Sequence, residues 1–281
     1  MKNLKHKVIL IIGLIVAGAI TLSAQNFEGK ATYQSARKMD GFGFKGEGMS
    51  PEMEEQLKKQ MAKQFQREYE LVFNLSESVW KEAESLGGGP ATASSGGMVI
   101  QMSTVGGGLT YKNTAENLFM QESDVFGKPF LVKDDLEPLE WEITQESKQI
   151  GNYTAYKAIY TNVRESMSMS FDSEQDEKEM TTVMDTVKLE AWYTPEIPVS
   201  QGPTRYWGLP GLIMEISDGA MSYVCTQVVL NPKEGVKIKR PSKGKEVNRE
   251  ELRAITEEKT KEMMEKYSNG GGEVQIKIGR G

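Results

Sequence analysis

The chain has 281 residues, with 34 basic and 40 acidic side chains and a single histidine, His6. An acidic chain lacks the cationic surface that phosphate neutralisation requires, so the composition argues against nucleic-acid binding. The length suits one large β-rich domain or two small ones.

The N-terminus has the pattern of a secretory signal peptide. A basic segment is followed by the apolar stretch 8–20, which is shorter than the roughly 20 residues of a membrane-spanning helix, and Ala24 is a suitable last residue before cleavage. We expect residues 1–24 to be removed on export, with an uncleaved anchor as the alternative. The remaining chain has no histidine and a net charge of −9, because three lysines are lost. The expected location is the periplasm, the outer membrane or the exterior.

Cys225 is the one cysteine of the chain, which excludes an intramolecular disulfide. We interpret it as a small buried residue of a strand. Pairing with another molecule is the alternative.

Two strand patterns flank a glycine-rich break at 41–48. Residues 26–39 and 67–84 both alternate in a period of two. The residues on one face are Phe27, Gly29, Ala31 and Tyr33 in the first stretch, then Tyr69, Leu71, Phe73 and Leu75 in the second.

Between these stretches the period changes to that of a helix, predicted over 50–66. Ser50 is a good N-cap and Pro51 the favoured first helical residue. One apolar stripe follows at a spacing of four residues. Its members are Met53, Leu57, Met61 and Phe65. The stripe could line a lipid site or simply pack as core.

The middle of the chain predicts a flexible loop and then strands. Residues 86–97 are rich in Gly and Ser and lack the GxxxxGK[ST] pattern of a phosphate loop. A hairpin of strands at 140–147 and 153–162 is the clearest element. Shorter strands are expected at 98–103, 109–112, 117–122 and 129–132.

Residues 164–186 are polar, acidic and rich in Met, and we interpret them as a long hairpin loop or mobile excursion. The thioethers of Met167, Met169, Met180 and Met184 are soft ligands suited to Cu(I). Ordinary packing or surface methionines are the alternative.

The C-terminal part predicts a strand from 187, proline-punctuated chain to 203, and a strand at 222–230. A helix over 249–267 is capped by Asn248, with Glu251 at the acidic position of a capping box. We therefore divide the chain into a β domain, 25–247, and a C-terminal helix with a flexible tail, 248–281.

The stretch "GLPGLI" at 208–213 predicts a type II turn, with Pro210 and Gly211 at its central positions and Gly208 allowing close backbone approach. The strand that leaves this turn should form a hairpin with 222–230 through Asp218 and Gly219. No nucleophile lies beside a base here, so the stretch is interpreted as structural.

This stretch resembles the signature of the GLPGLI family, secreted bacterial proteins of uncharacterised function. The resemblance covers most of residues 27 to 230. It implies a β-rich fold and an envelope role, and it carries over no catalytic residues. The other similar segments are "YELVFNLSES" (69–78), "FGKPFLVKDDLEPLEWEIT" (126–144), "IGNYTAYKAIYT" (150–161) and "AWYTPEIPVSQGP" (191–203).

Because the chain after residue 24 has no histidine, it cannot form a Ser-His-Asp triad, a Cys-His catalytic pair or the commonest zinc sites. General acid–base catalysis by a pair of carboxylates remains an alternative. The candidates are Asp134, Asp135, Glu137 and Glu140. We predict no catalytic, cofactor-binding or metal-ligating residue and no cofactor.

Together these patterns predict a mainly β (α+β) fold, a curved antiparallel sheet or half-barrel with two amphipathic helices. This plan is similar to that of periplasmic lipoprotein carriers. We expect a non-enzymatic envelope protein that binds a lipid or other apolar ligand, or an outer-membrane protein. The alternatives are copper handling through the Met-rich segment, or a structural partner of outer-membrane machinery. An enclosed apolar cavity would favour the lipid, and a solid core with an exposed apolar surface would favour a protein partner.

Overall fold

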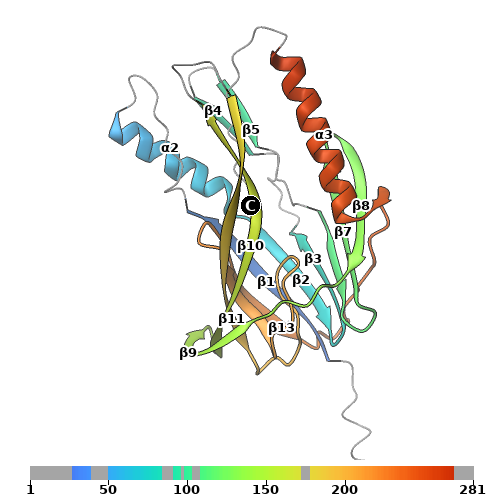
Figure 1. The fold of residues 1–281 in the computed structure, drawn as a ribbon. Coiled ribbons are helices and arrows are strands. Elements are labelled where there is room, and N and C mark those ends of the chain that lie inside the picture. The colour runs from blue at the N-terminus through green and yellow to red at the C-terminus, as the bar shows by residue number, and fades with distance from the viewer. Residues whose placement is uncertain are drawn as a thin grey trace, which may run out of the picture.

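The computed structural model describes residues 27–38, 50–83, 91–95, 98–102, 108–171 and 178–268. The predicted signal peptide, the break at 41–48 and the tail beyond 268 lie outside these residues. The described chain forms one large, open, almost wholly antiparallel sheet, a separate two-stranded sheet and two helices (Figure 1). The prediction of a mainly β fold is therefore confirmed.

Strands make up most of the described chain, and the two helices lie near its beginning and its end. In chain order the elements are β1 (Glu28–Arg37), α2 (Pro51–Gln64), β2 (Glu68–Asn74), β3 (Glu77–Glu82), β4 (Ala91–Ser95), β5 (Met98–Met102), β6 (Thr110–Asn113), β7 (Leu118–Val125), β8 (Lys128–Asp135), β9 (Glu142–Ile150), β10 (Tyr153–Phe171), β11 (Lys178–Thr194), β12 (Leu212–Ser217), β13 (Met221–Leu230), β14 (Lys245–Val247) and α3 (Arg249–Ser268).

The large sheet has twelve strands in the order β14-β8-β7-β6-β3-β2-β1-β13-β12-β11-β10-β9. β14 pairs in parallel with β8 and was not expected, because three residues are too few to show a period. Side chains of β6 and β7 line the same hollow as side chains of β10 and β11, although five strands separate β6 from β11 in this order. The sheet must therefore be strongly curved, and we call the side that bears this hollow its concave face.

The alternation predicted for the first strand is confirmed by burial on the concave face. Ala31 and Tyr33 of β1 are completely buried, and Tyr33 lies opposite Cys225 of β13. Cys225 is a buried free thiol, as expected for a strand residue, and burial raises its pKa to about 12. It is therefore protonated and unreactive at neutral pH.

The single strand expected over 67–84 is wrong, because the chain turns back at Leu75 and Ser76. The side-chain oxygen of Asn74 accepts hydrogen bonds from the backbone N–H groups of Ser76 (2.9 Å) and Glu77 (2.6 Å). This side-chain turn separates β2 from β3. Leu75, predicted on the buried face, is 61% exposed.

The loop expected at 86–97 and the excursion expected at 164–186 both contain strands. Residues 91–95 form β4, which pairs with β5. Residues 164–171 continue β10 and residues 178–186 belong to β11, with continuous pairing between the two strands. The alternation was missed because polar residues such as Glu165, Lys178 and Thr182 interrupt the apolar positions.

Helix α3 begins with the predicted capping box. Asn248 Oδ1 accepts from the N–H of Glu251 at 2.8 Å, and the Glu251 carboxylate accepts from the N–H of Asn248 at 3.0 Å. Leu252 and Ile255 then pack on the apolar side chains of β7 and β8, and Figure 1 shows α3 lying along these strands. Neither helix in the described part of the chain has the length and apolar character needed to span a membrane.

The connection from β11 to β12, residues 195–211, crosses the concave face, and we call it the crossing segment. Ile197, Val199 and Leu209 are buried in the same clusters as the strand side chains beneath them. Two tryptophan side chains also donate hydrogen bonds to backbone carbonyls in this part of the chain. Trp141 Nε1 donates to the carbonyl of Trp207 at 2.8 Å, and Trp207 Nε1 donates to the carbonyl of Glu137 at 3.0 Å.

Lys112 of β6 holds the crossing segment by hydrogen bonds. Its side chain is completely buried, and Nζ donates to the carbonyl oxygens of Gly202 (2.6 Å) and Tyr206 (2.8 Å). Burial lowers the pKa of this amine to about 7. The neutral form still has two N–H bonds, which is enough for both carbonyls. Gln201 adds a second tie, since its Oε1 accepts from the Ser78 hydroxyl at 2.6 Å.

The predicted type II turn is wrong, although its glycine is indispensable for another reason. A type II turn would bond the N–H of Leu212 to Leu209, but this N–H donates to Ile197 instead. The Gly211 N–H donates to the carbonyl of Leu209 at 2.8 Å, which makes a tighter turn around Pro210. Gly211 has a φ of +156°, and a Cβ there would lie 2.2 Å from the carbonyl oxygen of Thr194. The expected hairpin through Asp218 and Gly219 is confirmed.

We expect Gly211→Ala to cost about 3 kcal/mol or more, because the new Cβ meets fixed backbone of β11, and Gly211→Val to prevent folding. The matched control is Gly219→Ala, whose φ is +88° but whose Cβ would meet no described atom within 4 Å. The control should cost only about 1 to 2 kcal/mol. Urea unfolding measures both, and equal midpoints for Gly211→Ala and the wild type would contradict the close approach.

We expect the free energy of unfolding of the wild type, relative to that of Lys112→Met, to rise between pH 7 and about pH 10. Below pH 7 both the folded and the unfolded lysine are protonated, so the difference between the two proteins is constant. Above it only the unfolded chain holds the proton, because the folded pKa is about 7 and the unfolded value about 10.4. The relative stability of the wild type should therefore rise with a slope approaching about 1.4 kcal/mol per pH unit. Parallel curves for the two proteins in urea titrations would show that the amine has an ordinary pKa.

Candidate functional site

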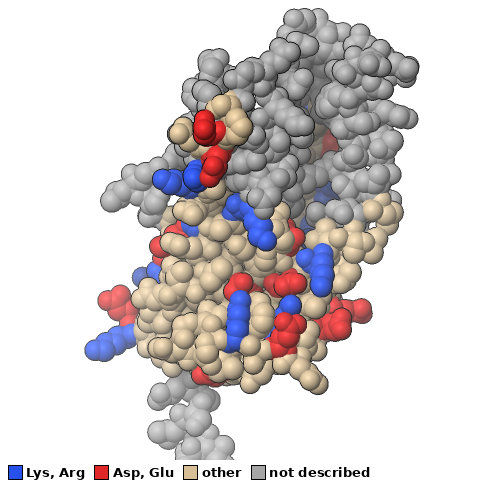
Figure 2. All heavy atoms as spheres, turned by 90° about the vertical axis from the view of Figure 1, so that its left-hand side faces the viewer, with Lys and Arg blue, Asp and Glu red and all other residues tan. Residues whose placement is uncertain are grey.

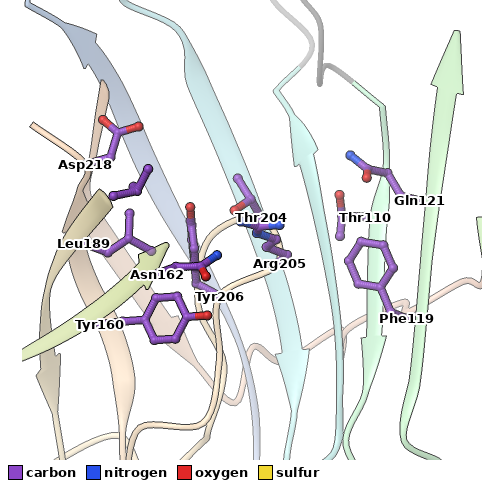
Figure 3. A pocket seen from close by; sticks show the side chains of 11 residues that line it. Thr110, Phe119, Gln121, Tyr160, Asn162, Leu189, Thr204, Arg205, Tyr206 and Asp218 are labelled. Carbon is purple, nitrogen blue, oxygen red and sulfur yellow. The ribbon is translucent and has the colours of Figure 1, made fainter. Parts of the chain in front are cut away.

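A hollow of about 230 Å³ lies on the concave face, between the two arms of the curved sheet (Figure 3). One wall comes from β6 and β7, the opposite wall from β10 and β11, and the crossing segment reaches it from between them. Its lining residues are Thr110, Phe119, Gln121, Tyr160, Asn162, Val187, Leu189, Thr204, Arg205, Tyr206 and Asp218. The hollow exists because curvature brings together segments that are distant in the sequence.

The walls of the hollow are mixed in character. Phe119 on one side and Tyr160 on the other supply aromatic rings, while Gln121 and Asn162 supply side-chain amides from the same two walls. Ligand pockets for small molecules usually measure about 300 to 1,000 Å³ and are mostly apolar. The hollow is smaller and more polar, so it suits a small group with hydrogen-bonding atoms better than an acyl chain.

Two charged residues take part in the lining. Arg205 is exposed on the crossing segment, and its guanidinium carbon lies 5.7 Å from the centre of the Tyr206 ring. Asp218 lies at the hairpin between β12 and β13. Its Oδ1 accepts from the N–H groups of Ala220 (2.9 Å) and Met221 (2.7 Å), so this carboxylate is occupied with the turn.

A second candidate surface lies on the far ends of β10 and β11. β9 pairs with β10 up to Ile159, and β12 pairs with β11 from Glu190. Residues 160–171 and 178–189 therefore extend beyond their neighbours as a two-stranded ribbon. Met169 is the register partner of Met180, and Met184 is the partner of Glu165.

This register sorts the residues of the ribbon onto two faces, because alternate positions of a strand point to opposite sides. One face, which we call the Met face, combines the apolar positions with Glu165, Lys178, Thr182 and Thr186. Its apolar members are Val163, Met167, Met169, Phe171, Met180 and Met184. The other face carries Arg164, Ser166, Ser168, Ser170, Glu179, Thr181, Val183 and Asp185.

The described side chains of the Met face are open to solvent. Val163 is 55% exposed and Met184 is 67% exposed. Tyr160, Asn162, Val187 and Leu189 line the hollow from alternate positions of the same strands, so the Met face and the hollow lie on opposite sides of the sheet.

The outer side of the sheet next to the ribbon is polar and charge-paired. Lys148 Nζ lies 2.6 Å from a Glu215 carboxylate oxygen, and Lys157 Nζ lies 3.5 Å from one of Glu190. Figure 2 shows acidic and basic side chains interspersed over the described surface on that view, without a continuous region of one sign. The Met face differs from this polar surface in its apolar positions.

The carboxylates considered for acid–base work have different neighbours. Arg249 at the start of α3 lies 3.4 Å from Asp134 and 3.2 Å from Glu137. These two acids therefore attach the helix to β8 and the segment after it. Asp135 and Glu140 are exposed.

For metals, the described residues contain no group of three or more His, Cys, Asp or Glu side chains that could hold an ion. The thioether positions of the Met face are a separate case, because Met is not one of these four residue types. On α2, the side chains of Met53, Leu57 and Met61 lie outside the described residues, so the lipid-lining stripe stays a prediction. Phe65, just beyond the helix, is half-buried with the Arg37 guanidinium 5.1 Å from its ring centre.

Sequence reasoning missed Lys112, Arg205 and the Met face. A lysine on a short strand normally indicates solvent, so nothing in the sequence signals a buried amine. Arg205 belongs to irregular chain whose path depends on the curvature of the sheet. The Met face could have been found by testing "MSMSF" and "EMTTVM" for a period of two.

Comparison with known proteins gives a match to a family and a distant structural similarity. Residues 141–215, from just before β9 to within β12, match the model of a family described as "Protein of unknown function (Porph_ging)". A search of curated proteins by sequence gave no match.

Two solved structures, "Structure of PNGF-II in C2 space group" and "Structure of PNGF-II in P21 space group", are similar with a TM-score of 0.45 each. They are 15% and 13% identical and are matched over 82% of this chain and 32% and 33% of theirs, so the chain spans about a third of their length. The family match, which includes the crossing segment, fits the expectation of a bacterial family whose function is not known.

Proposed function

We propose that the protein is an exported, non-enzymatic binding protein of the bacterial envelope, of the GLPGLI type, which docks a partner protein through the Met face of its ribbon. The signal-peptide pattern of residues 1–24 supports export. The "GLPGLI" stretch, which lies inside the segment matched to a family of unknown function, supports the family.

The observation that carries the proposal is the sorting of the ribbon residues by register. Six apolar positions fall on one face, and its two described apolar side chains are exposed. Exposed apolar patches of this kind mark surfaces for other proteins. Met suits such a surface because its flexible, polarisable side chain adapts to partners of different shape.

The concave face supports a protein partner better than a lipid. The crossing segment occupies this face with buried side chains, and the hollow beside it is small and partly polar. A lipid carrier of the expected kind would need a longer apolar space than the described residues provide. The similarity to lipoprotein carriers therefore stays a prediction, with a lipid as the alternative ligand.

We expect a photo-crosslinking residue at position 184 to give a discrete crosslinked protein in intact source cells. Position 185 is the matched control, because it is adjacent in sequence and lies on the opposite face of the ribbon. The product at 184 should disappear with Val163→Glu, which places a charge on the same face. Equal products at both positions, or none at either together with a lipid-sized adduct in native mass spectrometry, would overturn the docking proposal.

A second candidate function, Cu(I) handling, is favoured by the pairing of Met169 with Met180. Cross-strand Cβ atoms lie about 4.5–5.5 Å apart and diagonal neighbours about 7–8 Å, and by register Met167 is a diagonal neighbour of Met180. Thioethers are the soft ligands that select Cu(I).

One set of variants distinguishes the two proposed functions. Met167→Leu/Met169→Leu/Met180→Leu keeps the face apolar but removes its thioethers, so it should preserve docking and abolish Cu(I) uptake. Competition with a chromogenic Cu(I) chelator measures the uptake, and Met221→Leu on β13 is the control. Absence of Cu(I) uptake by the wild type, or uptake unchanged in the triple variant, would exclude copper handling by the ribbon.

A further inference from the structure

Arg205 is the residue of the hollow that indicates a ligand. It is exposed on the wall, and no carboxylate lies within 4.0 Å of its guanidinium among the residues that the structure describes. By contrast, Arg67, Arg240 and Arg249 all form salt bridges with acids. The chain has more acidic than basic residues, yet Arg205 has no acidic partner among the described residues. Its guanidinium is therefore available to bind an anionic ligand in the hollow.

The guanidinium already has a contact within the protein that favours one orientation. Its position over the Tyr206 ring is that of a cation–π contact. The backbone of Tyr206 is fixed in turn, because its carbonyl accepts from the buried Lys112 amine at 2.8 Å. Less conformational freedom is therefore lost on binding, which favours affinity.

The surroundings select the shape of the bound group. Gln121 and Asn162 offer amide N–H donors on opposite walls, and the rings of Phe119 and Tyr160 flank the same space (Figure 3). Arginine recognises planar carboxylates with two parallel hydrogen bonds. Asp218, the acid of the lining, lies away from Arg205 in this view and is occupied with its turn.

We infer that the hollow is a binding site for a carboxylate carried on an aromatic or similarly flat group, with Arg205 as the residue that receives the charge. This site is separate from the Met face, so it neither requires nor replaces docking through the ribbon. The carboxylate can belong to a free organic acid or to the C-terminus of a peptide, and the chemistry recognised is the same.

The test is a titration of the exported chain, residues 25–281, followed by amide resonances in nuclear magnetic resonance. The probes are benzoate and its neutral isostere benzamide, and a hexapeptide ending in phenylalanine with a free or an amidated C-terminus. We expect the acid of each pair to bind at least about tenfold more tightly than the amide, with the largest shifts at Thr204–Tyr206 and Gln121. Tighter binding of the peptide than of benzoate would assign the carboxylate to a chain end, and the reverse would assign it to a small acid.

Two variants decide whether Arg205 is responsible. Arg205→Gln should erase the difference between acid and amide, while Arg253→Gln, an exposed arginine on α3, should leave it unchanged. Equal binding of acids and amides by the wild type, no binding of either at millimolar concentration, or a preference that survives Arg205→Gln would overturn the inference. The crosslinking result at position 184 does not depend on any of these outcomes.

Discussion

The hydrogen bonds from the buried Lys112 amine to the crossing segment are the interaction on which the concave face depends. A twelve-stranded, almost wholly antiparallel sheet has two faces, and its curvature produces a space that must be filled with apolar side chains or water. The chain fills it with its own residues 195–211, which are irregular and therefore carry backbone carbonyls into the interior. Each such carbonyl needs a donor, because an unsatisfied buried polar group costs about 1 to 3 kcal/mol. Lys112 supplies two of these donors.

The same arrangement explains why the concave face bears a shallow hollow and not an enclosed cavity. With the crossing segment fixed, Tyr206 and Arg205 occupy the space between the two arms of the sheet, and a shallow, mixed surface is left. The glycine of the GLPGLI stretch belongs to this architecture. Gly211 lets the returning chain touch the end of β11, so the stretch serves the path of the backbone and does not form a reactive loop.

Local features of this fold could be predicted from the sequence, and features created by long-range pairing could not. The alternation in β1 and the capping box of α3 depend on neighbouring residues, and both are present. The division of residues 67–84 depends on one Asn74 side chain that replaces a backbone turn, which a period-two pattern conceals. The Met face requires the register between β10 and β11, and the hollow requires the curvature of the whole sheet. Burial of Lys112 was unpredictable because strand order, not composition, places it beneath the crossing segment.

The position of β1 also determines when the sheet can be completed during folding. β1 lies between β2, which follows closely in the chain, and β13, whose residues 221–230 are among the last of the sheet. One edge of β1 can pair early, but the other waits until nearly the whole chain is available. Folds dominated by such distant contacts form slowly, and an uncovered strand edge in the meantime can pair with other chains. The seam between β1 and β13 therefore joins the two neighbouring strands that lie farthest apart in the sequence, and it cannot form until residues 221–230 are available.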